Sequence, residues 1–356
     1  MKTILDLHNI YYSYHTSHGE TRALSNLSFS LAPGEFAAVV GPSGCGKSTL
    51  LSLICGLMEP QTGEILLNGE PVLGNSPQIG YMLQHDHLFE WRTIYRNILL
   101  GPEISHTLNK EIREKAKSML TQYGLKSFIH ARPSQLSGGM RQRAALIRTL
   151  LPEPELLLLD EPFSALDEFL KDRLQQELIQ MLEDYPGTVI LVSHSRDEIY
   201  RFSDELIVMD QGKVVCHGNT EETFDRPEWK EAARLTGCKN ITVAIREDEH
   251  HLQVPGWGIR FTLERQIDED IRYVGIRAHD FEPIWLADGE QPEEGWIKVK
   301  VDSVAKLPFE HKYFLKESEE QEDVCWFVQR DLWDVLEKKG MPGWLKIPEE
   351  KLLLLK

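Results

Sequence analysis

The sequence has few cysteines, and their spacing does not suggest a structural use. The 356 residues include five cysteines, an odd number, and no C-x-x-C pair. A disulfide framework needs paired cysteines, and a structural zinc site needs closely spaced ones. These absences predict a protein of a reducing compartment that holds no structural zinc.

Long apolar runs and positive charge are also missing. No apolar run approaches the ~20 residues that cross a bilayer. The N-terminal stretch is interrupted by Asp6, His8 and Asn9, unlike a signal peptide. The net charge of -17 argues against a nucleic acid partner, because phosphates favour a basic surface. We expect a cytoplasmic protein, or one bound peripherally to the cytoplasmic face of the cell membrane through a partner.

A glycine-rich loop is the first feature that indicates chemistry. "GPSGCGKST" (41–49) follows an expected buried strand, "EFAAVV", and precedes an apolar helical pattern. Gly41-x4-Gly46-Lys47-Ser48 matches the Walker A pattern, in which backbone amides hold phosphates, Lys contacts the β- and γ-phosphates, and Ser binds Mg²⁺. The alternative is a glycine-rich turn that only caps a helix. The strand–loop–helix context favours the nucleotide site.

The pattern along the chain predicts two domains. It favours short strands and turns in residues 4–73, helices in residues 103–152, and alternating strands and helices in residues 155–218. After about Leu235, short β-like runs alternate with charged or Gly/Pro turns. We therefore predict an α/β P-loop core with an antiparallel β subdomain and a helical insertion, followed by a small all-β, barrel-like domain. The predicted ranges are 1–235 for the core, about 90–152 for its insertion and 236–356 for the second domain.

Four further stretches place polar residues at the ends of expected elements. "LLLLDEP" ends in Asp160 and Glu161, which a strand places on opposite faces, so that one can meet a metal ion and the other a water. The alternative is a pair of acids that caps the next helix. "LSGG" is either a second anion cradle or a plain turn. His194 ends a strand and could belong to a core, and Gln84 stands where another strand stops.

In this order and spacing, the motifs resemble those of the ATP-binding cassette (ABC) ATPases. The resemblance covers residues 1–235 and comprises the Walker A motif, the Q-loop, the LSGG signature, the Walker B motif, the D-loop (164–167) and the H-loop. Met140 departs from the commonest signature, which has Gln at that position. The resemblance implies an ATPase that uses ATP and Mg²⁺.

The resemblance also implies roles for individual residues. Tyr14 would stack on adenine, whereas Tyr11 and Tyr12 are expected as strand residues. Glu161 would polarise the attacking water, and His194 would contact the γ-phosphate. The implied residues are Glu161, His194, Gln84 and Lys47 for catalysis; Tyr14, Gly41, Ser43, Gly44, Cys45, Gly46, Lys47, Ser48, Thr49, Ser137, Gly138 and Gly139 for the nucleotide; and Ser48, Gln84 and Asp160 for the metal ion.

A head-to-tail homodimer is a further implication. Ser137 and Gly139 of one copy would bind the γ-phosphate of the ATP held by the other, so that two copies enclose two ATPs and exclude water. An exporter half-molecule would carry its own membrane helices, and a DNA-repair ATPase would contain long coiled coils. A translation-type ABC protein would carry a second cassette and basic segments. The chain has none of these features, which favours an importer ATPase with integral membrane permease subunits and, indirectly, a solute-binding protein as partners. An ATPase acting on nucleic acid or ribosomes is the alternative from another class.

Two resemblances bear on the solute. "HLFEWRTIYRNILLG", "LSGGMRQR" and "DEPFSALDE" look most like nitrate-, sulfonate- and taurine-type importer ATPases. "LTGCKNI", "VGIRAHDFEP" and "WLKIPEEKLLLL" are similar to the β-barrel regulatory domains of molybdate and sulfate importer ATPases. Both imply a small oxyanion or a sulfonate. The second domain is then either a ligand sensor or an appendage that stabilises the structure or the dimer.

Two local hypotheses concern single segments. Residues 85–92 carry Phe89 and Trp91 beside mixed charge, which suggests a docking surface for a permease helix; packing between the core and the insertion is the alternative. Cys45 lies among amides and beside Lys47, which would favour a thiolate. We therefore expect thiol reagents to inactivate the protein and ATP to protect it. The alternative for Cys45 is a small residue that is merely tolerated.

Overall fold

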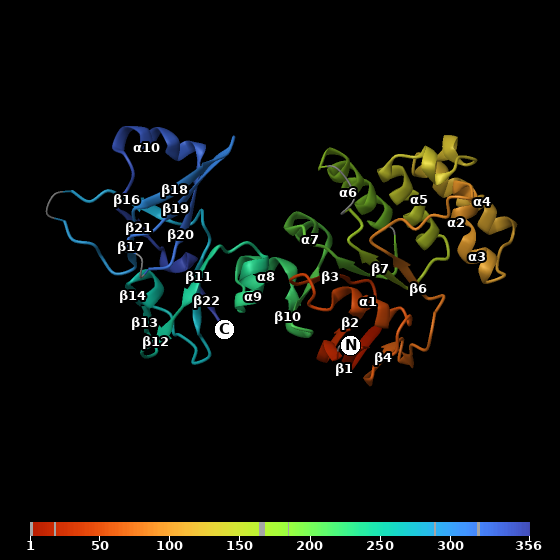
Figure 1. Ribbon diagram of the computed structural model, residues 1–356, viewed down its shortest axis with the longest axis horizontal. Coiled ribbons are helices and arrows are strands. Elements are labelled where there is room, and N and C mark those ends of the chain that lie inside the picture. The colour runs from red at the N-terminus through yellow and green to blue at the C-terminus, as the bar shows by residue number, and fades with distance from the viewer. Residues whose placement is uncertain (1–2, 18, 164–167, 184, 288–289, 319–320) are drawn as a thin grey trace. The chain divides into compact units, whose positions relative to one another are not determined.

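The chain folds into two compact units in the computed structural model. The units span Met1–Glu221 and Glu222–Lys356 (Figure 1). The described residues are 3–17, 19–163, 168–183, 185–287, 290–318 and 321–356. No helix within these residues is long and apolar enough to cross a membrane.

The units divide the chain earlier than the boundary expected at residue 235. α9 (Lys230–Leu235) belongs to the second unit. There, Ala233 joins Cys238 and Leu355 in a small buried cluster. The apolar side of α9 is therefore covered by strands of the second unit.

A six-stranded sheet is the centre of the first unit. Its order is β10-β9-β3-β8-β7-β6, and neighbours run parallel except for the antiparallel pair β9–β10. β9 and β10 form a hairpin around Gln211 and Gly212, and both residues have a positive φ, of 44° and 77°. The strands are β3 (Phe36–Val40), β6 (Ile79–Met82), β7 (Leu156–Asp160), β8 (Thr188–Val192), β9 (Glu205–Asp210) and β10 (Lys213–Asn219).

A smaller antiparallel sheet forms a second layer of this unit. Its order is β2-β1-β4-β5. A turn at Asn68 and Gly69 joins its last two strands, with a positive φ at both residues. The strands are β1 (Leu5–Thr16), β2 (Gly19–Leu31), β4 (Thr62–Leu67) and β5 (Glu70–Pro71).

Alternate residues of the central strands belong to two different cores. Leu156 and Leu158 of β7 pack into a core shared with α1 (Lys47–Ile54) and the antiparallel sheet. Leu157 and Leu159 pack into a second core with the helices of the insertion. This is the period of two that a strand imposes on its side chains. A continuous apolar run such as "LLLL" is therefore needed, since both faces of the strand are covered.

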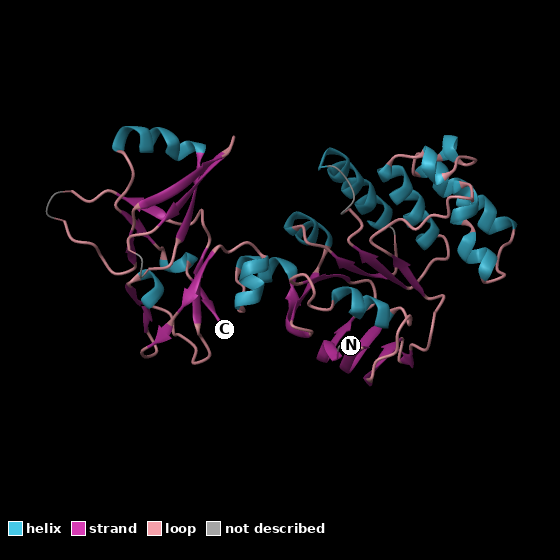
Figure 2. Cartoon of the chain, in the orientation of Figure 1, coloured by secondary structure: helices cyan, strands magenta, loops and turns pink. Residues whose placement is uncertain are grey.

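The insertion is mainly helical (Figure 2), as the sequence predicts. Asn109 caps α4 by accepting from the Ile112 backbone amide at 2.8 Å, and Ala116 and Leu120 of that helix are fully buried, as the helical spacing predicts. The α-helices of the unit after α1 are α2 (Ile94–Ile98), α3 (Leu100–Ile104), α4 (Lys110–Gln122), α5 (Gly138–Leu150), α6 (Glu168–Glu183), α7 (Arg196–Phe202) and α8 (Thr220–Asp225), which crosses the boundary between the units. The 3₁₀ turns are Lys126–Phe128 and Pro133–Gln135.

The second unit is mainly β, as the sequence predicts. Its strands pair in four three-stranded antiparallel sheets, of order β11-β15-β22, β12-β13-β14, β16-β21-β17 and β18-β19-β20. Trp257 and Trp326 are almost completely buried in its core. The strands are β11 (Asn240–Val243), β12 (Ile245–Arg246), β13 (His251–Val254), β14 (Ile259–Thr262), β15 (Tyr273–Ile276), β16 (Glu282–Ile284), β17 (Trp296–Lys298), β18 (Val301–Lys306), β19 (Glu310–Leu315), β20 (Val324–Gln329), β21 (Trp344–Lys346) and β22 (Leu353–Leu355).

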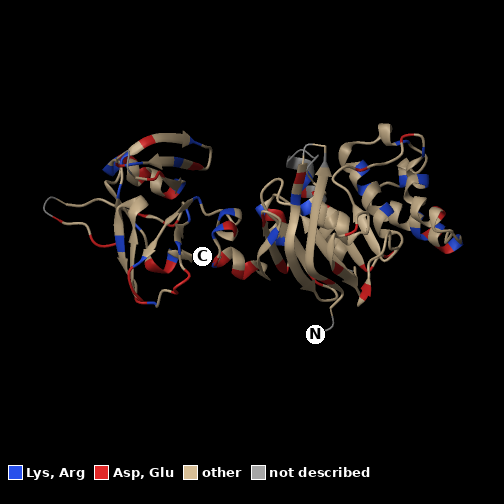
Figure 3. Ribbon diagram, turned by 60° about the horizontal axis from the view of Figure 1, so that its bottom comes forward, with Lys and Arg blue, Asp and Glu red and all other residues tan. Residues whose placement is uncertain are grey.

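The range 236–356, predicted to be all-β, contains an α-helix. α10 (Trp333–Lys339) follows the 3₁₀ turn Arg330–Leu332; two further 3₁₀ turns are Pro255–Trp257 and Glu349–Lys351. Trp333 of α10 stacks on His311 of β19, with ring centroids 4.1 Å apart. In both units, basic and acidic residues are interspersed along the elements (Figure 3).

Candidate functional site

Four of the motifs follow the carboxyl ends of adjacent parallel strands. The glycine-rich loop follows β3, Asp160 ends β7, His194 follows β8, and Gln84 follows β6. These strands are neighbours in the order β3-β8-β7-β6. Because the carboxyl ends of parallel strands lie at one edge of a sheet, the fold brings all four motifs to the same edge, where ligands bind in such folds.

The glycine-rich loop has a shape that only glycine allows at two positions. A Cβ on Gly41 would lie 2.3 Å from the Met209 carbonyl oxygen of β9. Gly46 has a φ of 106° and precedes α1 as its N-cap, and a Cβ there would lie 2.7 Å from the Ala23 carbonyl oxygen. The loop is therefore packed against two strands. Its backbone amides precede a helix N-terminus, which favours an anion.

Lys47 is nearly buried and directed back over the loop. Its Nζ donates to the Gly41 carbonyl oxygen at 2.8 Å and to the Pro42 carbonyl oxygen at 3.1 Å. Both acceptors are neutral backbone groups. The ammonium is thus held at the loop by two backbone carbonyl groups, and a phosphate there would add an opposite charge.

The expectation that the surroundings of Cys45 favour a thiolate is wrong. The residue is only 4% exposed. Burial raises the pKa of the Cys45 thiol, and the charge of Lys47, whose Nζ lies 3.9 Å from Sγ, only partly opposes this. Loss of hydration disfavours the thiolate more than one nearby cation favours it. Cys45 is therefore a small buried residue beneath the loop, consistent with the alternative drawn from the sequence.

Asp160 lies beside Ser48 at the end of β7. Tyr81 donates its hydroxyl to Asp160 Oδ2 at 3.3 Å, and the nearby Ser48 hydroxyl also favours the ionised form of the carboxyl group. Burial, and then the negative charge of Glu161, nevertheless raise the pKa of Asp160. The site therefore holds a carboxylate whose charge is incompletely compensated by its neighbours.

This pair of oxygen donors fits a magnesium ion. Mg²⁺ prefers oxygen ligands and is usually held by one or two protein groups together with waters and substrate phosphates. Within the described residues, no cluster of three His, Cys, Asp or Glu side chains could hold a metal ion. Ser48 and Asp160 would therefore hold Mg²⁺ together with a bound nucleotide, and the dication would stabilise the Asp160 carboxylate and link phosphate oxygens to the protein.

Glu161 lies between Gln84 and His194. The Gln84 Nε2 donates to Glu161 Oε2 at 3.0 Å, and His194 Nε2 lies 2.9 Å from Glu161 Oε1. Glu161 has a φ of 46°, which is uncommon outside glycine, and its backbone amide donates to the Val192 carbonyl oxygen at 2.9 Å. This conformation ends β7 and gives Glu161 surroundings different from those of Asp160. Gln84, assigned to both catalysis and the metal ion from the sequence, directs its amide nitrogen to Glu161.

Tyr14 lies beside the first helix turn. Its hydroxyl is 3.1 Å from Thr49 Oγ1, and 41% of the residue is exposed. Tyr12 packs edge-on against it, with ring centroids 5.1 Å apart. Tyr11, Tyr12 and Tyr14 all belong to β1, as expected for the first two. An exposed aromatic ring next to a phosphate loop is suited to stacking on a base.

The signature segment forms its own local structure. Ser137 is the N-cap of α5, where its Oγ accepts from the Met140 amide at 3.4 Å; Gly138 and Gly139 form the first turn. The Ser137 side chain is exposed. This hydrogen bond joins the Ser137 side chain to the first turn of its own helix.

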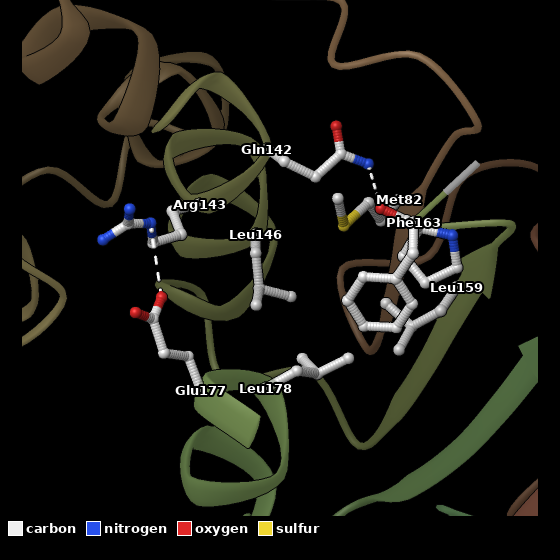
Figure 4. A pocket seen from close by; sticks show the side chains of 9 residues that line it. Met82, Gln142, Arg143, Leu146, Leu159, Phe163, Glu177 and Leu178 are labelled. Carbon is white, nitrogen blue, oxygen red and sulfur yellow. Dashed lines mark hydrogen bonds and ion pairs between the residues drawn. The ribbon is translucent and has the colours of Figure 1, made fainter. Parts of the chain in front are cut away.

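α5 is nevertheless tied to the segment that follows β7. Gln142 donates to the Pro162 carbonyl oxygen, and Arg143 of α5 pairs with Glu177 of α6 at 3.4 Å (Figure 4). These four residues line a cavity of about 20 Å³ together with Leu146 and Leu178. The expected D-loop, 164–167, lies outside the described residues.

The segment after Gln84 is anchored by a residue that the sequence analysis did not select. Asn97 is fully buried; its Oδ1 accepts from the Phe89 amide at 2.8 Å, and its Nδ2 donates to the carbonyl oxygens of Phe89, Arg92 and Thr93. Trp91 remains 71% exposed and lies against Phe89, with ring centroids 4.6 Å apart. A buried asparagine inside an apolar helical pattern was the available sequence signal.

The sequence matches the family model described as ABC transporter over residues 24–164. It is 42% identical to YtlC of Bacillus subtilis, an uncharacterized ABC transporter ATP-binding protein, in an alignment covering 60% of this chain and 83% of YtlC. The chain belongs to the ABC transporter ATP-binding proteins. Proteins of this family hydrolyse ATP, and this chain is an ATPase.

Other ABC transporter ATP-binding proteins related to this chain are named for different solutes. WtpC of Pyrococcus horikoshii, a molybdate/tungstate import ATP-binding protein, is 33% identical over 80% of this chain and 82% of its own length. Further relatives are named as import proteins for iron(III), sulfate/thiosulfate and nitrate, and as a putrescine transport protein. These names agree on transport and differ in solute.

A solved ABC structure has the same fold. It is a dimeric ATP-binding cassette in a post-hydrolysis state with ADP and phosphate bound, 29% identical to this chain, with a TM-score of 0.55. The match covers 61% of this chain and 98% of that one. The predicted P-loop α/β core is confirmed, and the ABC transporter family accounts for the motifs at the edge of its sheet.

Proposed function

We propose that this chain is the ATP-hydrolysing subunit of an importer, held at the cytoplasmic face of the cell membrane by permease subunits. The observation that carries this proposal is the Gln84–Glu161–His194 cluster beside Asp160 and Ser48. The Glu161 carboxylate lies beside the polar side chains of Gln84 and His194, whereas the Asp160 carboxylate lies near the Ser48 hydroxyl, and these two oxygen donors suit Mg²⁺. The import function rests on the relatives named as import proteins.

In this proposal the two acids have separate roles. Asp160 and Ser48 hold Mg²⁺, and Lys47 and the loop amides hold the phosphates. Glu161 orients and polarises the attacking water, while His194 and Gln84 hold the Glu161 carboxylate in position. His194 follows β8 at the edge of the sheet where the glycine-rich loop lies, and in this proposal it also contacts the γ-phosphate. Tyr14 stacks on the adenine.

The working form in this proposal is a homodimer that encloses two ATPs. The Ser137 hydroxyl is exposed and separate from the glycine-rich loop of its own chain. A second copy, packed head to tail, would bring Ser137 and Gly139 to the γ-phosphate and exclude water. The dimeric structure with the same fold supports this arrangement.

Glu161→Gln tests the role of this carboxylate. We expect kcat to fall by about 100-fold or more, the range for loss of a general base, while ATP still binds, because Lys47 and the loop are unchanged. Closed dimers should accumulate with ATP and Mg²⁺, measured by size-exclusion chromatography with light scattering. Glu153→Gln is a matched control, because Glu153 is an exposed partner of Lys115. Hydrolysis by Glu161→Gln at the parent rate would move the catalytic role elsewhere.

The exposed ring of Trp91 supports a permease contact. We propose that residues 85–92 form the docking surface, with Asn97 fixing their backbone. Trp91→Ala should weaken co-purification with the permease about tenfold or more, as for an aromatic residue that dominates an interface, with unchanged ATP hydrolysis by the isolated chain. Leu73→Ala is the control, since Leu73 is 79% exposed in the same unit. Equal permease recovery with both variants would contradict the docking role.

The proposed solute is a small oxyanion or a sulfonate. The relation to a molybdate/tungstate import protein over most of the chain supports it, as does the similarity of the cassette motifs to nitrate and sulfonate importer ATPases. A molybdate- or sulfate-type importer whose second unit senses the oxyanion is the competing candidate. Thermal-shift measurements on the full chain with molybdate, sulfate, nitrate and taurine would separate them, since only a sensor binds the anion directly.

A further inference from the structure

A buried carboxylate lies beside the segment that carries His194. Glu198 of α7 is 3% exposed, and its carboxylate oxygens accept from three side chains. Ser193 donates its hydroxyl to Oε2, and Gln175 donates its Nε2 to Oε1 at 3.0 Å. Lys171 Nζ lies 2.6 Å from Oε1. A buried charge is tolerated when it is paired and hydrogen-bonded, as here.

One side of this network involves the two chain neighbours of His194, Ser193 and Ser195. The Ser193 hydroxyl that donates to Glu198 also accepts from the Ser195 backbone amide at 3.0 Å. The Ser195 side chain in turn accepts from the Glu198 amide at 3.5 Å. Ser193 is therefore bonded directly to the Glu198 carboxylate, and Ser195 is linked to it through the Ser193 hydroxyl, so that the backbone on both sides of His194 is held.

The other side of the network belongs to α6. Lys171 and Gln175 are four residues apart on this helix, so they share one face and both reach the same carboxylate. Glu198 thus joins α6, which begins at Glu168, to the segment between β8 and α7. Because α6 also pairs with α5 through Arg143 and Glu177, the network connects His194 to the helical side of the unit.

We propose that Glu198 is a positioning residue for ATP hydrolysis, which holds the Ser193–Ser195 backbone so that His194 meets Glu161. The inference rests on the roles proposed for Glu161 and His194. Glu198 itself lies beneath the surface and acts through the backbone on either side of His194. Replacing it with Gln removes the charge that balances Lys171 and leaves one acceptor oxygen where two serve the network now.

The test compares Glu198→Gln in two backgrounds, the parent protein and His194→Ala. We expect Glu198→Gln alone to lower kcat about tenfold with the KM for ATP nearly unchanged, because an interaction used in the hydrolysis step is lost and the nucleotide contacts remain. In the His194→Ala background the same substitution should change the rate less than about twofold, since the side chain it positions is gone. Single-turnover hydrolysis with protein in excess measures the slow variants. Glu114→Gln is the matched control, as Glu114 forms an exposed pair with Lys117.

Each outcome decides the matter. Equal losses in both backgrounds would mean that Glu198 supports the fold and not His194, which overturns the inference. An unchanged kcat for Glu198→Gln would overturn it as well, and would leave the proposed roles of Glu161 and His194 untouched. An unchanged kcat for His194→Ala would instead remove the proposed role of His194, and the inference with it. Thermal unfolding of every variant identifies loss of fold.

Discussion

The burial of Cys45 predicts that the phosphate loop resists thiol reagents. The perturbation is N-ethylmaleimide at pH 7 on the nucleotide-free protein. The ordinary pKa is 9.0, and burial raises it. Fewer than about one in 100 thiols at this position is therefore ionised at pH 7, and the thiolate is the reactive form. Because the residue is also only 4% exposed, we expect alkylation of Cys45 to be slower than that of the partly exposed Cys216 and Cys325.

Peptide mapping by mass spectrometry, sampled over time, measures this order directly. When the peptides of Cys216 and Cys325 are largely alkylated, the Cys45 peptide should remain mostly unmodified, and ATP hydrolysis should persist. Denaturation in guanidinium before labelling is the control, because all five cysteines should then react at similar rates. Rapid labelling of Cys45 that ATP prevents would refute the reasoning and restore the open, reactive loop expected from the sequence.

Two further substitutions test the site through stability. Gly46→Ala places a Cβ at a position with a φ of 106°, only 2.7 Å from a backbone oxygen. We expect the free energy of unfolding to fall by about 1–3 kcal/mol and calorimetry to show weaker ATP binding. Values equal to those of the parent protein would contradict the packing described for this loop. Asp160→Asn should raise the free energy of unfolding at pH 7.5 by about 0.5–2 kcal/mol while abolishing hydrolysis. Because the pKa of Asp160 is raised in the folded state, ionisation of this carboxyl group destabilises the parent protein as the pH rises. The stability gained by Asp160→Asn should therefore vanish near pH 3, as measured by chemical denaturation. A stability gain that does not depend on pH would contradict this reasoning.

The sequence predicts the elements around the phosphate site well because their patterns are local. The run Leu156–Leu159 needs apolar faces on both sides, and the Gln211–Gly212 and Asn68–Gly69 pairs supply residues that accept a positive φ. The order of the motifs also indicates which strand ends meet. None of these inferences requires knowledge of how distant side chains pack.

The depth of Cys45 and the role of Glu198 could not be predicted in this way. The Cys45 thiol is covered by groups brought by β9, and the electrostatic benefit of Lys47 is smaller than the cost of burial. Glu198 appears in the sequence as one charge among several in "SRDEIY", and only packing against α6 turns it inward. α10 is short and carries Trp333 and Asp334 in its first turn, so its sequence gives no clear helical stripe.

The six-stranded sheet also separates two apolar cores of the first unit. Local opening that exposes side chains of one core leaves the other core covered, because alternate residues of β7 point to opposite sides. Amide hydrogen exchange should therefore fall into two classes, with faster exchange in α2–α4 and slower exchange in α1 and the central strands. The glycine-rich loop, which precedes α1, should therefore remain folded when the helical side opens.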